Sequence, residues 1–276
     1  MKTRKLLLSI LIVILFIVAV LIILIYPKLK PFFHAETVKI DNNLTFISGG
    51  GGNSMILVTD SAVVVIDTKM GKNAEELYKM VKEKAGTKKI IVINTHYHVD
   101  HTKGNKYYQG CKIYIGDYDN LFLQKNVEPE NRPTDFVKDS LELNLGNETV
   151  LLYNLGQAHT YDDMVVYLKN RNILMTGDLV FNHLNPVLKR EGGADVEKWI
   201  SVLQVILSRW GNATIVPGHG PMGDEEIVAS LKQYFEDMKT AALDSKKADD
   251  LKSKYKSWAA VPFMSSPEKT IQFIKR

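Results

Sequence analysis

The longest apolar run of the chain lies near its N-terminus, from Leu6 to Tyr26, with Ser9 as its one clearly polar residue. These 21 residues would form about 31 Å of helix, which matches the hydrocarbon core of a bilayer. The pattern predicts a transmembrane signal-anchor over residues 6–26. The alternative is a cleaved signal peptide, whose apolar part usually spans about 7–15 residues and ends at small residues. Here the run ends in Tyr-Pro-Lys, which favours the uncleaved anchor.

Basic residues flank this run unequally. Lys2, Arg4 and Lys5 precede it, whereas Lys28 and Lys30 follow it. The positive-inside rule therefore predicts a cytoplasmic N-terminus, residues 1–5, and a body outside the cytoplasm. The expected location is the cell membrane, with a single span.

Residues 27–36 are interpreted as a juxtamembrane linker. After them the apolar runs become shorter, and strand-like runs alternate with apolar residues at helical spacing. Short runs bounded by turn residues predict strands, and spaced apolar residues among charges predict helices. The predicted strands are Val38–Ile40, Leu44–Ile47, Met55–Thr59, Ala62–Asp67, Lys89–Asn94, Lys112–Ile115, Val150–Leu155, Met164–Leu168, Ile173–Thr176 and Thr214–Val216. The predicted helices are Lys72–Lys84, Val196–Ser208 and Ile227–Ala242. This order predicts one layered α/β (α+β) domain over 37–245, followed by a helical extension, 246–276, that folds back onto it.

The net charge of the chain is distributed unequally between its N-terminal segment and its body. The sequence carries 35 basic and 31 acidic residues, a net +4. Residues 1–31 hold five basic residues and no acidic one, so the body retains 30 basic against 31 acidic residues and carries −1. Nothing in the body therefore favours binding to nucleic acid. The single cysteine, Cys111, excludes an intrachain disulfide and a thiolate zinc site.

Three of the seven histidines fall in one hexapeptide directly after the buried strand Lys89–Asn94. His96, His98, Asp100 and His101 offer four groups that bind metals, at a strand end where side chains can converge. Three further candidates also follow predicted strands, namely His159, Asp178 and His219. The shared position at strand ends predicts one metal-binding pocket for a small-molecule substrate.

Two more residues are candidates for orienting a ligand or contacting substrate. Asn53 stands in a run of four glycines that predicts a loop between two strands and lacks the Gly-Lys-Ser/Thr of a phosphate loop. His183 follows Asp178 by five residues, in a loop expected to skirt the pocket. Asp162 and Asp163, close to His159, are expected to be turn or cap residues.

These residues together resemble the metallo-β-lactamase fold hydrolases. The match is carried by His-x-His-x-Asp-His at 96–101, by His159, by Asp178 after a glycine, and by His219 in Gly-His-Gly. The resemblance implies a four-layer αββα sandwich with two divalent metal ions at one edge. It implies that His96, His98 and His159 bind one ion, that Asp100, His101 and His219 bind the other, and that Asp178 bridges them. Asp67 matches an early aspartate of the family that orients a ligand.

The implied activity is hydrolysis. A hydroxide that bridges the two ions would attack an ester, thioester, lactone or β-lactam carbonyl, with Asp100 or Asp178 taking the proton of the water. Zinc is the default metal, and the same ligands accept iron or manganese. Asp178 stands where some true β-lactamases have cysteine, so the chain is similar there to thioesterase and nuclease branches. A di-iron redox protein and a metal-binding protein without turnover remain as alternatives on the same fold.

Overall fold

The computed structural model describes residues 12, 14, 16, 20, 33–261 and 264–276. The predicted anchor, residues 6–26, therefore lies outside the described residues except for Ile12, Ile14, Phe16 and Val20, which are helical. Within the described part of the chain, no helix combines the length and the apolar character needed to cross a bilayer.

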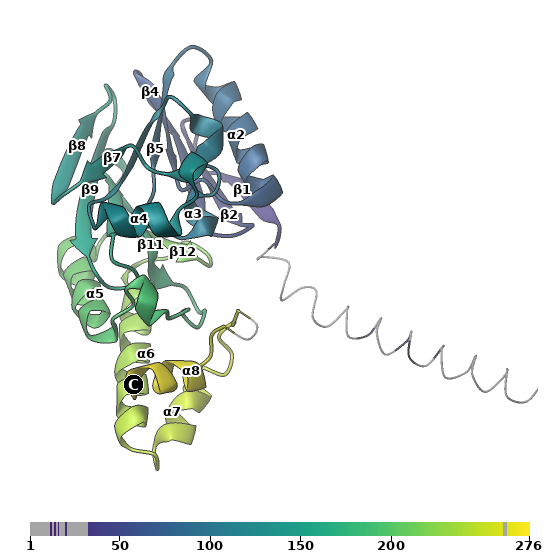
Figure 1. The fold of residues 1–276 in the computed structure, drawn as a ribbon, viewed down its shortest axis with the longest axis vertical. Coiled ribbons are helices and arrows are strands. Elements are labelled where there is room, and N and C mark those ends of the chain that lie inside the picture. The colour runs from purple at the N-terminus through teal and green to yellow at the C-terminus, as the bar shows by residue number, and fades with distance from the viewer. Residues whose placement is uncertain (1–11, 13, 15, 17–19, 21–32, 262–263) are drawn as a thin grey trace, which may run out of the picture.

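The domain contains two β-sheets that face each other (Figure 1). The first sheet has seven strands in sequential order: β1 (Ala35–Lys39), β2 (Leu44–Gly49), β3 (Ser54–Val58), β4 (Ala62–Ile66), β5 (Lys89–Ile93), β6 (Lys112–Gly116) and β7 (Asp135–Val137). The second has five, in the order β12 (Thr214–His219), β11 (Ile173–Phe181), β10 (Asp163–Leu168), β9 (Thr149–Gly156) and β8 (Ser140–Asn144). Pairing is parallel from β4 to β7 and between β11 and β12, and antiparallel elsewhere.

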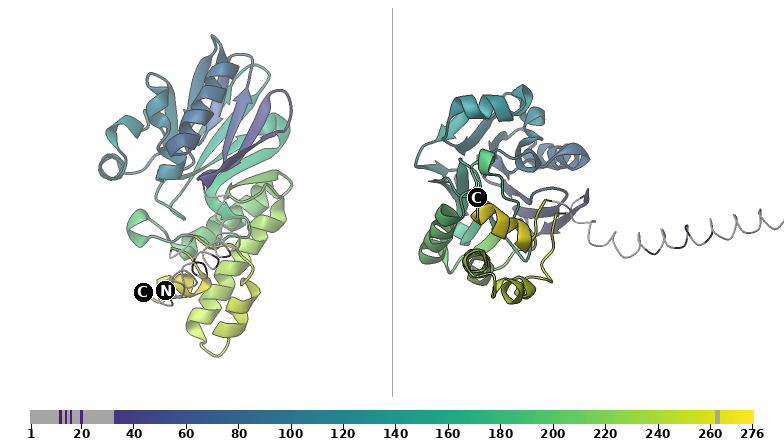
Figure 2. Two further views of the ribbon diagram at one scale, coloured as in Figure 1. Left: turned by 90° about the vertical axis from the view of Figure 1, so that its right-hand side faces the viewer. Right: turned by 60° about the horizontal axis from the view of Figure 1, so that its bottom comes forward.

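Helices cover the outer faces of both sheets. The described α-helices are α2 (Gly71–Ala85), α3 (Val99–Thr102), α4 (Asn120–Asn126), α5 (Val196–Trp210), α6 (Glu225–Leu243), α7 (Ala248–Lys254) and α8 (Pro267–Ile274). In two further views, α2 lies outside the first sheet and α5 and α6 lie outside the second (Figure 2). The layers therefore follow the order α, β, β, α, which confirms the predicted sandwich.

The central strands β3 and β4 of the first sheet are buried on both faces because each face meets another layer. In β4, Val64 and Ile66 point into the core between the sheets, whereas Val63 and Val65 pack against α2. This alternation follows from the two-residue period of a strand. On the other side, α5 presents an apolar stripe at helical spacing to the second sheet, formed by Trp199, Leu203, Ile206 and Trp210.

Several element bounds differ from the sequence-based expectation. β11 was expected to end at Thr176, but it continues to Phe181 because its parallel pairing with β12 resumes after a register shift at Gly177. Asp178 therefore lies within a strand rather than after one. The sequence pattern also missed β7, β8 and α4. β8 is a half-exposed edge strand and β7 has three residues, so neither carries a strong apolar signal.

The C-terminal extension packs against the part of α6 that projects beyond the sheets (Figure 1). It contains two short helices, α7 and α8, in the region predicted to be a helical extension. Tyr255 donates a 2.9 Å hydrogen bond to Asp237 Oδ2, and the ring of Trp258 stacks on Tyr234 at 5.2 Å. The hydroxyl of Tyr234 is 2.7 Å from Thr270 Oγ1. These contacts fix both helices to α6.

Candidate metal centre

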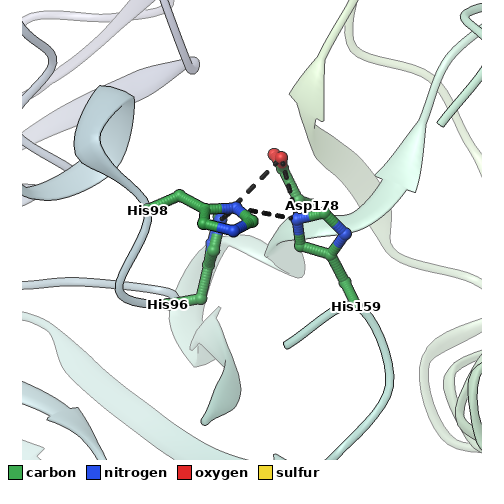
Figure 3. Close-up of side chains that lie close together, drawn as sticks. All are labelled: His96, His98, His159 and Asp178. Atoms are coloured by element: carbon green, nitrogen blue, oxygen red, sulfur yellow. Dashed lines mark hydrogen bonds and ion pairs between the residues drawn. The ribbon is translucent and has the colours of Figure 1, made fainter. Parts of the chain in front are cut away.

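Four side chains from three separate segments meet at one edge of the sandwich (Figure 3). His96 and His98 follow β5, His159 lies between β9 and β10, and Asp178 comes from β11. His98 Nδ1 is 3.1 Å from His96 Nε2 and 3.0 Å from His159 Nε2. Asp178 Oδ2 is 3.4 Å from His159 Nε2 and 3.8 Å from His96 Nε2. We call these residues the first ligand group.

The chemistry of this group fits a bound cation. Burial, reinforced by the neighbouring imidazoles, holds the pKa of His96 well below its ordinary value and lowers that of His98 to about 3. Both rings are therefore neutral at pH 7 and can offer lone pairs to a metal. Ring nitrogens that converge this closely suit ligation at about 2.0–2.1 Å from a shared ion. The three histidines and Asp178 thus fit a metal site.

Asp100, His101 and His219 form a second ligand group beside the first. His219 Nε2 is 3.3 Å from Asp100 Oδ2, and His101 Nε2 is 3.7 Å from the same oxygen. Asp178 Oδ1 is 3.1 Å from His101 Nε2 and 3.4 Å from His219 Nε2. One oxygen of Asp178 therefore faces each ligand group.

Opposite charges balance one another within the second group. Burial opposes a charge on His219, but Asp178 and Asp100 outweigh it and raise the pKa of His219 to about 9. Burial likewise opposes a charge on Asp178, but His219 and His101 hold the pKa of its carboxyl well below the ordinary value. The carboxylate of Asp178 is therefore ionised and available to a cation.

Asp67 contacts the Nδ1 side of the His101 ring, which faces away from the second ligand group. Its Oδ2 lies 2.7 Å from His101 Nδ1, and it accepts 2.8 Å hydrogen bonds from the backbone N–H and the hydroxyl of Thr95. Both Asp67 and His101 are fully buried. Because Nδ1 faces this carboxylate, Nε2 is directed toward the second ligand group.

Gly218 and Asp163 help to position His219 and His159. His219, expected after a strand, is the last residue of β12, and a Cβ at position 218 would overlap Asp178 Oδ1, so only glycine allows this strand end to approach the carboxylate. Asp163 accepts hydrogen bonds from the backbone N–H groups of Ala158 and Thr160, which flank His159. Asp163 thus organises the loop that carries His159.

Asn53 and His183 are not placed as substrate contacts. Asn53 is buried, and its Nδ2 donates to the carbonyls of Pro217 and Gly220 at 2.9 and 2.8 Å. These two bonds hold the end of β12 that carries His219, in line with the ligand-orienting role considered for Asn53. His183 is exposed, and its ring packs edge-on against Trp258. The ring of His183 thus contacts the C-terminal extension, and its expected role beside the pocket stays a prediction.

Lys69 is a fully buried lysine that the sequence pattern did not single out. Its Nζ donates to three carbonyls, those of Ile47, Gly49 and Gly52, at 3.2, 2.6 and 2.6 Å. Burial lowers its pKa to about 7, although Asp67 and Asp100 oppose the shift. Gly52 in turn lies so close to the ring of His101 that a Cβ there would overlap it. Lys69 thus fixes the glycine-rich loop against the second ligand group.

Lys69→Met is expected to lower the free energy of unfolding by about 1–3 kcal/mol, because three buried carbonyls lose their donor. Chemical denaturation of both proteins measures the difference. Lys79→Met is the matched control, since Lys79 lies on the surface of α2 in an i,i+4 pair with Glu75, and an exposed pair of this kind contributes little to stability. Equal stabilities of the two variants would contradict the assigned role.

The fold and the two ligand groups define a metal-site protein built on an αββα sandwich. The family model described as the metallo-beta-lactamase superfamily matches residues 47–219. A type 2 metallo-beta-lactamase from Bacillus cereus is 30% identical over 199 residues, which cover 70% of this chain and 77% of that protein.

Solved structures support the same assignment. A metallo-beta-lactamase from Pontibacter korlensis superposes with a TM-score of 0.65 at 25% identity, over 74% of this chain and 99% of that one. The sec-alkylsulfatase Pisa1 from a Pseudomonas species has a TM-score of 0.68 at 13% identity, over 87% of this chain and 50% of that one, and shares the fold. The chain belongs to the metallo-beta-lactamase superfamily and is a metal-dependent hydrolase.

Proposed function

We propose that this protein is a membrane-anchored hydrolase that holds two divalent metal ions, by default zinc, and cleaves an ester, thioester, lactone or β-lactam carbonyl. The observation that carries the proposal is the position of Asp178, whose two oxygens face different ligand groups. His96, His98 and His159 would hold one ion, and Asp100, His101 and His219 the other.

When bound, such a pair of ions supplies a hydroxide nucleophile at neutral pH and polarises the carbonyl under attack. The residues of the chain then have separate tasks. Asp67 keeps Nε2 of His101 directed at the site. Asp100 lines the cavity above the ligand groups, and we assign its carboxylate as the acceptor of the proton released by the attacking water.

The range of substrates follows from the relatives only in part. The relative from Bacillus cereus is named a metallo-beta-lactamase, so a β-lactam is one class to test. The loops that line the cavity, rather than the fold, set which of these classes is cleaved.

A hydrolysis screen of the full chain tests this function. A thioester, a lactone, a chromogenic β-lactam and a phosphodiester are assayed with added zinc and after chelation. We expect at least one carbonyl substrate to be cleaved with zinc, with the rate lost on chelation and restored by zinc. Cleavage of the phosphodiester alone, or of no substrate, would show the proposal to be wrong.

The membrane anchor over residues 6–26 has its own test, with the body proposed to lie outside the cytoplasm. The double variant Ile14→Arg, Phe16→Arg places two charges in the middle of the run, at roughly 2.5–3.5 kcal/mol each at a helix centre. The wild-type chain should stay with the membrane fraction after an alkaline wash, and the variant should leave it. The control Ile14→Leu, Phe16→Leu should behave as wild type. Release of the wild-type chain by the wash would contradict the anchor.

A further inference from the structure

A cavity of about 750 Å³ opens above the two ligand groups. Apart from the ligands, its described lining is largely apolar, and Lys189 and Glu191 are the charged side chains of that lining. Six apolar residues form much of its wall: Phe33, Met70, Val99, Leu184, Val261 and Met264. A cavity of this size accommodates a small-molecule substrate.

Four of these apolar side chains are also open to solvent. Phe33 is 66% exposed, Val99 56%, Met264 46% and Met70 36%. Single exposed apolar residues are ordinary on a protein surface, but several around one cavity mark a binding surface. The entrance of the cavity is therefore apolar, directly beside the polar ligand groups.

Segments on both sides of the 47–219 region that matches the family build part of this wall. The carbonyl of Phe33 accepts a 3.0 Å hydrogen bond from Asn73 Nδ2, at the start of α2. On the other side, Ala259 donates to the carbonyl of His183 at 2.9 Å, and Asn185 donates to that of Ala259 at 2.8 Å. These bonds fix the segment that carries Val261 beside residues 183–185, which include Leu184 of the cavity wall.

We propose that the substrate of this hydrolase carries an apolar chain next to the bond that is cleaved, and that this chain lies against Phe33, Val261 and Met264. The inference rests on the proposed function and adds the substrate class, an amphiphile such as a medium-chain acyl ester. The polar end would lie at the ligand groups and the apolar chain at the wall, which matches the division of the cavity into polar floor and apolar entrance.

The test uses the full chain, loaded with zinc and held in lipid nanodiscs, with p-nitrophenyl esters from acetate to decanoate. Each methylene that leaves water should raise kcat/KM about three- to fourfold until the wall is covered. The octanoate-to-acetate ratio of kcat/KM should therefore be far above one in the wild type. A ratio near or below one would overturn the inference.

Two variants of the cavity wall and one control distinguish binding of the ester at the wall from partition of the ester into lipid. Met264→Lys and Phe33→Lys should each lower the octanoate-to-acetate ratio at least about tenfold, since a charge replaces apolar surface. Both sites are exposed, so folding should tolerate the change. Leu243→Lys is the control: Leu243 is 89% exposed at the end of α6, outside the cavity lining, and both rates should stay as in wild type. An unchanged ratio in the two wall variants would overturn the inference.

A measurement without turnover distinguishes the two proposals. Decanoate should raise the melting temperature of the zinc-loaded wild type more than acetate does, and this difference should vanish in Met264→Lys. Cleavage of acetate ester without any chain-length effect would leave the proposed function standing and overturn the inference. Absence of all ester cleavage together with selective stabilisation by decanoate would support the apolar wall and refute an ester substrate.

Discussion

Asp178→Asn is expected to lower kcat/KM by on the order of 10³-fold or more and to reduce the metal content below two ions per chain. The substitution keeps the size of the side chain and removes the charge that faces both ligand groups. An amide also turns a donor toward either His101 or His159, whose Nε2 atoms lie 3.1 and 3.4 Å from the carboxylate oxygens. Loss of the charge should therefore weaken both sites at once.

The matched control for this variant is Asp250→Asn, which makes the same change on the exposed surface of α7. Steady-state kinetics and elemental analysis are carried out on wild type and both variants. The control should retain wild-type rates and metal content. An Asp178→Asn protein with two ions and more than a tenth of the wild-type rate would show that this carboxylate does not join the two ligand groups.

Asp67→Asn is expected to destabilise the protein by about 3 kcal/mol and to weaken metal binding about 10- to 100-fold. The reason is the fully buried pair of Asp67 with His101, at 2.7 Å between Oδ2 and Nδ1. Asparagine suits this position because Asp67 has a φ of 57°, a left-handed conformation that asparagine tolerates. The backbone is thus kept, and the charge behind His101 is removed.

Thermal and chemical unfolding measure the stability change of Asp67→Asn, and titration of the metal-free protein with zinc measures the affinity. Asp250→Asn is again the control and should match wild type in both. Stability and affinity that both stay at wild-type values would mean that Asp67 does not orient the ring of His101.

The meeting of the candidate ligands at one edge of the sandwich could be predicted because their positions follow from local rules. His96, His98 and His101 come directly after an apolar strand, and β5 ends at Ile93 in the structure. A histidine cluster after a buried strand is recognisable in one sequence, since the strand fixes where the cluster must lie. The run of apolar residues in β4 likewise predicted a strand, and the structure buries it on both faces.

The hydrogen-bond partners of the supporting residues could not be predicted because they are distant in sequence. Asn53 bonds to carbonyls more than 160 positions away, and Lys69 bonds to the carbonyls of a loop about 20 positions before it. His183 was expected near the pocket from its spacing to Asp178, and that spacing could not indicate its contact with Trp258 of the C-terminal extension. Such contacts depend on how the sheets pack together and leave no local pattern.

Hydrolysis by this protein is proposed to depend on two metal ions, one in each ligand group. Elemental analysis of the full chain, purified without added metal and assayed in the same preparation, is the decisive measurement. We expect close to two divalent ions per chain in the active protein, and activity that falls in step with metal removed by chelation. Full activity in a preparation without bound metal would contradict the two-metal site.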